Sequence, residues 1–125
     1  MYIEFTARAI HASKEDDFYL VGFSEEEYDN SNYLLLSKAF EFDEQDARHG
    51  TDGEYFELNG QEYSGYKFCR AAFVSKNEFQ LHLNPNRFGI GEVKISLMQV
   101  EVETEFMQYL KEILGEKVYI MEGQW

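Results

Sequence analysis

The chain has 125 residues, of which 44% are hydrophobic and 17% aromatic, and its formal net charge is −13 at pH 7. Its length suits one domain covering residues 1–125, and its aromatic content is too high for an intrinsically disordered chain. The negative charge disfavours partners that are themselves anionic, so we expect binding neither to nucleic acid nor to a membrane surface.

Period-two alternation of apolar and polar residues predicts a half-buried strand at residues 3–9. Strand-like apolar runs predict further strands at residues 18–23, 33–42 and 55–58. Polar stretches at 13–17 and 24–32 separate the first three strands and are expected to be a turn and a loop. Asn59-Gly60, between residues 55–58 and 61–63, is a strong hairpin signal because both residues tolerate positive φ.

The second half continues with strands and contains one clear helix. The expected strands are residues 66–74, 79–83, 93–102 and 118–121. Thr104 is the expected N-cap of the helix, and Gly115 its end. An apolar stripe at helical spacing lies between them: Phe106, Tyr109, Leu110, Ile113 and Leu114. The pattern as a whole predicts the α+β class, with a mostly antiparallel sheet and one C-terminal helix packed on a face.

An acidic block, FEFDEQDARHGTDGE, occupies residues 40–54 between two strand-like runs. Residues 1–60 carry 15 acidic and 4 basic residues, whereas residues 61–125 carry 9 and 7. Charge of this density resists burial, so we expect the block to form an exposed rim that faces a positively charged partner. The alternative is a solvated loop that prevents edge strands from pairing with other molecules.

No catalytic or metal-binding motif stands out in the sequence. His11, His49 and His82 have no metal-ligand spacing with one another or with Cys69, and the acidic block does not match a calcium loop. Cys69 lies in a strand-like run and is expected to be a small buried hydrophobic residue. We therefore predict that the protein is not an enzyme and has no cofactor and no bound metal.

The N-terminus lacks a basic segment followed by an apolar stretch, so we expect no secretory signal. No apolar run approaches the ~20 residues that a membrane span requires. The lone Cys69 allows no intrachain disulfide and is compatible with a reducing compartment. A cytoplasmic location is the resulting expectation.

The run from Tyr33 to Asp46, YLLLSKAFEFDEQD, resembles the central segment of the immunity protein 10 family of bacterial polymorphic toxin systems. In that family an apolar Tyr-Leu-Leu/Met-Leu run leads into a Phe-Asp-Glu-Gln-Asp-like block, and glycines and further strands follow. Residues at comparable places in this chain are Gly50, Asp52, Tyr55 to Leu58, Gly65 and Phe79 to Leu83. The resemblance covers about residues 18–114 and includes the C-terminal helix.

The resemblance implies a small antitoxin that acts in contact-dependent competition by binding and neutralising a cognate toxin domain, with no catalytic residues of its own. The residues expected to contact the toxin are acidic or aromatic and lie in or near the block: Asp43, Glu44, Asp46, Asp52, Tyr28, Tyr33 and Tyr55. The carboxylates would pair with Arg or Lys of a basic toxin, and the tyrosines would serve as anchors.

A hypothesis of a different class is a small-ligand-binding module or an uncharacterised hydrolase with a pocket between sheet and helix. Its candidate residues are Tyr63, Tyr66, Cys69 and His82. This hypothesis requires a pocket in which these polar groups converge.

Overall fold

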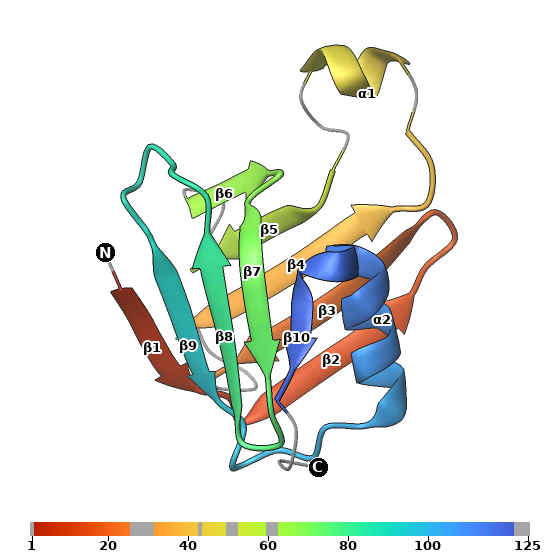
Figure 1. Cartoon of the computed structure of the whole chain (residues 1–125). Coiled ribbons are helices and arrows are strands. Elements are labelled where there is room, and N and C mark those ends of the chain that lie inside the picture. The colour runs from red at the N-terminus through yellow and green to blue at the C-terminus, as the bar shows by residue number, and fades with distance from the viewer. Residues whose placement is uncertain (1, 26–31, 43, 50–52, 60–62, 122–125) are drawn as a thin grey trace.

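The computed structural model describes residues 2–25, 32–42, 44–49, 53–59 and 63–121, which form two five-stranded sheets and one long helix (Figure 1). The strands of the first sheet, sheet A, are in spatial order β1 (Tyr2–Thr6), β9 (Glu92–Ser96), β8 (Glu78–Leu83), β7 (Cys69–Val74) and β10 (Val118–Ile120). The β7–β8 and β8–β9 pairs are antiparallel, whereas the edge strands β1 and β10 pair in parallel with β9 and β7.

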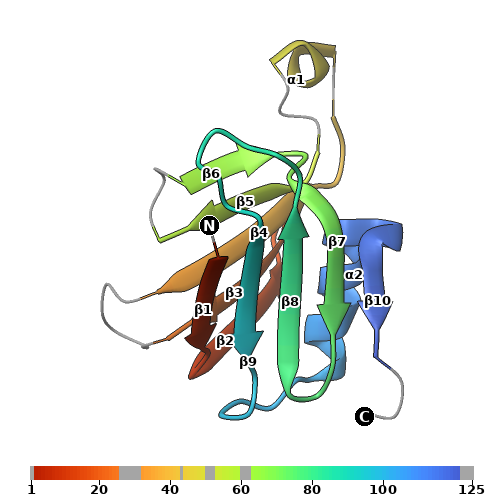
Figure 2. The same ribbon diagram turned by 60° about the vertical axis from the view of Figure 1, so that its left-hand side comes forward.

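The second sheet, sheet B, is a fully antiparallel meander. Its strands follow chain order: β2 (Ala9–Lys14), β3 (Phe18–Ser24), β4 (Tyr33–Ala39), β5 (Tyr55–Leu58) and β6 (Tyr63–Tyr66). The β5–β6 pairing agrees with the predicted hairpin, although Gly60, Gln61 and Glu62 lie outside the described residues. Between β4 and β5 the chain leaves the sheet and forms the short helix α1 (Glu44–His49), which projects away from both sheets (Figures 1 and 2).

The long helix α2 (Thr104–Leu114) packs on the inner face of sheet B beside β10, and the short 3-10 segment η1 (Gly115–Lys117) follows it. Its buried side chains come from the predicted stripe. Thr104 is the first helical residue and not the N-cap, because Glu103 takes that position with extended backbone. Gly115 ends the helix as predicted, at a φ of 62°, a left-handed conformation that glycine adopts without steric cost.

Aromatic side chains join the two sheets and the helix in one buried core. The ring of Phe23 in sheet B stacks on Phe79 of sheet A at 4.7 Å between centroids and meets the edge of Phe106 of α2 at 5.3 Å. Further along, Phe56 of sheet B contacts Phe68 at 5.0 Å. These contacts place Phe23 where sheet A, sheet B and α2 meet. Burial of apolar side chains of this kind is the main favourable contribution to folding.

The predicted α+β class is confirmed in its mostly antiparallel strand pairing and in the helix packed on a face. The prediction of one sheet is wrong, because the strands form two sheets. The expected strand at residues 3–9 is two strands in different sheets. The chain crosses over at Ala7 and Arg8, whose N–H groups donate to the Ser96 carbonyl of sheet A and the Ser24 carbonyl of sheet B. Period two continues through the crossover because both strands direct alternate side chains into the shared core.

The other expected strands differ from the observed ones mainly where they end. The expected strand at 66–74 is broken, because β6 ends at Tyr66 and β7 begins at Cys69 in the other sheet. Lys67, at the break, has a φ of 53° that no strand residue adopts. Strand β4 ends at Ala39 and not at residue 42, and β9 ends at Ser96 and not at residue 102.

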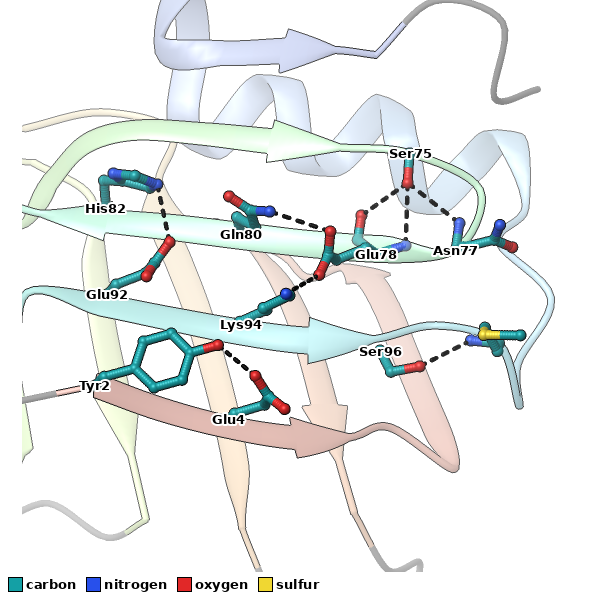
Figure 3. A network of polar contacts seen from close by, with 11 residues as sticks. Tyr2, Glu4, Ser75, Asn77, Glu78, Gln80, His82, Glu92, Lys94 and Ser96 are labelled. Carbon is teal, nitrogen blue, oxygen red and sulfur yellow. Dashed lines mark hydrogen bonds and ion pairs between the residues drawn. The ribbon is translucent and has the colours of Figure 1, made fainter.

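The outer face of sheet A carries a polar network that needs no functional explanation (Figure 3). Lys94 lies 3.0 Å from Glu78, whose carboxylate also accepts a hydrogen bond from Gln80. The Nε2 atom of His82 lies 3.2 Å from Glu92. These partly exposed pairs link adjacent strands and contribute little to stability.

Candidate protein-binding site

Three carboxylates of the acidic block, those of Glu41, Glu44 and Asp46, lie near one end of sheet B. Glu41 and Glu44 are exposed and Asp46 is half-buried, while Glu44 lies 3.6 Å from Arg48 one helical turn away. Strand β4 brings these residues close to the turn between β2 and β3, where the Phe40 N–H donates to the Asp17 carbonyl at 3.0 Å. We call these acidic residues the acidic rim: Glu15, Asp16, Asp17, Glu41, Glu44 and Asp46.

Glu54, the last residue of the block, does not follow the prediction of exposure. Its carboxylate is buried, accepts a hydrogen bond from the Cys69 N–H at 3.3 Å, and lies 3.1 Å from Lys117 Nζ. Its carbonyl accepts a hydrogen bond from the Lys67 N–H at 2.8 Å. Buried charge requires a partner of opposite sign, and this partner comes from η1, 63 residues further along the chain.

A cavity of about 370 Å³ lies beside the acidic rim, between α1 and the outer face of sheet B. Four aromatic side chains and Asp46 contribute to its lining, and we call it the aromatic cavity; the complete lining is Phe18, Ser37, Lys38, Ala39, Phe42, Asp46, Gly53, Tyr55 and Tyr66. Tyr55 and Tyr66 are cross-strand partners with ring centroids 5.0 Å apart. Phe42 and Tyr66 are 37% and 43% exposed, a large apolar area to leave in contact with water.

Tyr33 and Tyr55 lie on the same outer face of sheet B and share one acceptor. The Tyr33 hydroxyl donates to Glu57 Oε2 at 2.5 Å, and the Tyr55 hydroxyl donates to Glu57 Oε1 at 3.0 Å. Burial is the main cause that raises the pKa of Tyr55 above its ordinary value. Because all three side chains are partly buried and fixed by these bonds, they present a surface that loses little entropy on binding.

The structure therefore brings four of the seven predicted contact residues to one face. Tyr55 and Asp46 line the aromatic cavity and Glu44 lies on the adjacent rim, whereas Tyr33 is on the same face at the far end of β4. The other three, Tyr28, Asp43 and Asp52, lie outside the described residues.

Sequence reasoning missed Phe18 and Phe42 as lining residues, and it assigned Tyr66 to a different kind of site. The outward register of the strands is the signal that could have found Tyr66, because Ser37, Tyr55 and Tyr66 are aligned across β4, β5 and β6. Reading that register requires knowledge of which strands are neighbours.

The residues of the small-ligand hypothesis do not converge on one pocket. Tyr63 packs against Phe88 at 5.3 Å, Tyr66 lines the aromatic cavity, and His82 lies on the outer face of sheet A (Figure 3). Cys69 is buried, and burial raises the pKa of its thiol to about 12, which keeps it protonated and unreactive at neutral pH. This arrangement does not support nucleophilic catalysis by Cys69.

Within the described residues, no group of three or more His, Cys, Asp or Glu side chains could hold a metal ion. The same part of the chain contains no helix that is long and apolar enough to cross a membrane. What the described surface does offer is an acidic rim next to exposed aromatic rings, a composition typical of protein interfaces. The fold is a small, β-rich domain, and this face is its candidate protein-binding surface.

Comparison with known proteins gives the family. The model of the family described as Immunity protein 10 matches residues 6–109, and the chain belongs to that family. The match spans all of sheet B, the acidic block and the first half of α2. A search of curated proteins and a search of solved structures found no match. Membership implies an immunity protein that acts against a toxin, and such proteins are generally not enzymes.

Proposed function

We propose that this protein is an antitoxin that binds a cognate toxin domain with the acidic rim and the outer face of sheet B, and neutralises it by occlusion. The single observation that carries the proposal is the position of the acidic rim directly beside the exposed rings of the aromatic cavity. Carboxylates attract a basic partner, while fixed aromatic side chains supply most of the binding energy.

The contact surface includes Glu44, Asp46, Tyr33 and Tyr55, and by their position in the sequence also Tyr28, Asp43 and Asp52. With a net charge of −13, the protein would attract a basic toxin over a distance comparable to the Debye length, about 8 Å at physiological salt. The association rate should therefore fall steeply as salt is added, whereas dissociation should depend on the aromatic contacts.

The proposal includes three further expectations. The chain acts as a single domain, because strands from both ends of it share one core. It works in the cytoplasm, a reducing compartment that suits a chain whose single cysteine, Cys69, allows no intrachain disulfide. It has no catalytic activity and blocks the toxin by contact alone.

Co-expression with toxin domains encoded beside the gene tests the function. Rescue of growth and formation of a complex are expected, and failure of both would exclude the antitoxin role. The proposed surface is tested by the triple charge reversal Glu41→Lys, Glu44→Lys and Asp46→Lys, which should slow association at least tenfold.

A matched control reverses three exposed acids on other parts of the surface, Glu101→Lys, Glu112→Lys and Glu116→Lys, and so changes the net charge equally. If the attraction depends only on the net charge of the protein, the two triple variants will lose affinity equally, and the acidic rim is then not the binding surface. If the rim is the binding surface, the control will retain most of the association rate.

A further inference from the structure

The aromatic cavity has a chemistry that selects one kind of side chain. Its four rings come from separate segments: Phe18 from the start of β3, Phe42 from the segment before α1, Tyr55 from β5 and Tyr66 from the end of β6. The faces of aromatic rings carry partial negative charge, so a cation is attracted wherever the face of one of these four rings borders the cavity.

The charged residues in and around the cavity also favour a cationic ligand. Among the described residues, the lining contains one acidic side chain, Asp46, and one basic side chain, Lys38. Outside the lining, Glu41 and Glu44 are exposed on either side of Phe42 in the sequence, and the Asp17 carbonyl accepts a hydrogen bond from the Phe40 N–H. These acidic residues of the rim outnumber the basic Arg48, which lies 3.6 Å from Glu44. A cationic side chain would approach through this negative field.

Two cationic side chains of the same protein, those of Arg87 and Lys14, lie over aromatic rings. The Arg87 guanidinium carbon lies 4.8 Å from the centroid of Phe88. Lys14 Nζ lies 5.9 Å from the Tyr19 ring and 5.7 Å from Phe40. Arginine is the better fit for the cavity, because its planar guanidinium stacks on rings while its edge donates to a carboxylate, and because it sheds water more easily than an ammonium group.

We propose that the aromatic cavity receives an arginine side chain of the toxin, stacked against the rings of Phe42, Tyr55 and Tyr66 with its guanidinium edge directed at Asp46. This inference rests on the proposed function for the identity of the partner, but the cavity's selectivity can be tested without the toxin. The arginine would be the central anchor of the complex, and the acidic rim would surround it with weaker charge pairs.

The first experiment titrates the full chain with N-acetyl-arginine amide and follows the cavity residues by NMR. The matched probes are N-acetyl-citrulline amide, which has the same shape without the charge, and N-acetyl-lysine amide. Saturable shifts at Tyr55 and Tyr66 are expected with the arginine probe, with binding about tenfold weaker for citrulline. Equal binding of citrulline, or no saturable shift with arginine up to its solubility limit, would overturn the proposal.

The second experiment uses Phe42→Leu, Tyr66→Leu and Asp46→Asn, with Tyr119→Leu as the control. Phe42 and Tyr66 are partly exposed, so their replacement should leave the fold intact, and Tyr119 is a 52% exposed tyrosine on β10 outside the cavity. Each cavity variant should weaken binding of the arginine probe and of the toxin at least fivefold, and the control should not.

The two ideas fail in different ways. If the unmodified protein neutralises the toxin and the cavity variants do so equally well, the arginine site is wrong and the antitoxin function stands. If the cavity binds the arginine probe selectively but the protein binds none of the toxin domains encoded beside its gene, the arginine site is confirmed and the antitoxin function is wrong.

Discussion

The ion pair between the buried Glu54 and the exposed Lys117 gives the sharpest stability prediction, because its two members differ in exposure. The Glu54 side chain is 11% exposed and that of Lys117 is 44% exposed, with 3.1 Å between Oε1 and Nζ. Removal of Lys117 leaves a carboxylate in a site that water barely reaches. Removal of the Glu54 charge leaves an ammonium group that can turn into solvent.

The expected sizes follow from these exposures. Breaking a fully buried pair by removing one partner costs about 3–5 kcal/mol, while an exposed pair contributes about 0.2–1 kcal/mol. We therefore expect Lys117→Met to lower the free energy of unfolding by about 2 kcal/mol and Glu54→Gln by about 1 kcal/mol. The double variant should lose less than the sum of the two, because neither charge is then left without its partner.

Urea unfolding at neutral pH measures all four members of this double-mutant cycle. Glu116→Gln is the matched control, since it removes an exposed carboxylate from the same 3-10 segment and should change stability by less than about 0.5 kcal/mol. A coupling energy below about 0.5 kcal/mol, or a larger loss for Glu54→Gln than for Lys117→Met, would refute the reasoning.

Three further predictions concern the core, a backbone conformation and the thiol. Phe23→Ala should lower the free energy of unfolding by about 3–5 kcal/mol in urea unfolding, since the ring is 1% exposed and contacts all three layers; a loss below about 1 kcal/mol would contradict that role. Lys67→Gly should be about 1 kcal/mol more stable than Lys67→Ala, because only glycine takes a φ of 53° without strain, and equal stabilities would show that the conformation relaxes. Because burial raises the pKa of Cys69 from 9.0 to about 12, the unfolded chain loses this thiol proton first, so its contribution to stability is complete below about pH 9 and is lost as the pH rises toward 12. Urea unfolding across that range should show a shallower decline for Cys69→Ala, and identical slopes would mean that the thiol ionises equally in both states.

Local patterns were sufficient to predict most elements. The amphipathic stripe and Gly115 predict α2, and alternation, apolar runs and the Asn59-Gly60 hairpin signal predict most strands, because each such signal depends only on neighbours along the chain. The two serious errors, at residues 3–9 and 66–74, fall where the chain passes from one sheet to the other. Alternation reports which side chains face the core, and in two sheets that share a core it does not report the change of sheet.

The candidate site, too, depends partly on local sequence and partly on contacts between distant segments. The dense negative charge of residues 40–54 favours exposure, because desolvating several carboxylates is costly in any fold. Among the described acids of the block, Glu41 and Glu44 are exposed, whereas Glu54 is buried beside Lys117, which comes from the other end of the chain.

The sequence by itself determined the family, the β-rich class with its C-terminal helix and the sign of the surface charge, since these depend on residue order and composition. Only the tertiary structure decided that two sheets form, that Phe18, Phe42, Tyr55 and Tyr66 line one open cavity, and that the β2–β3 turn lies beside the segment that leads into α1. The reason is physical. Strand pairing brings together residues far apart in the chain, and no local propensity specifies which strands become neighbours.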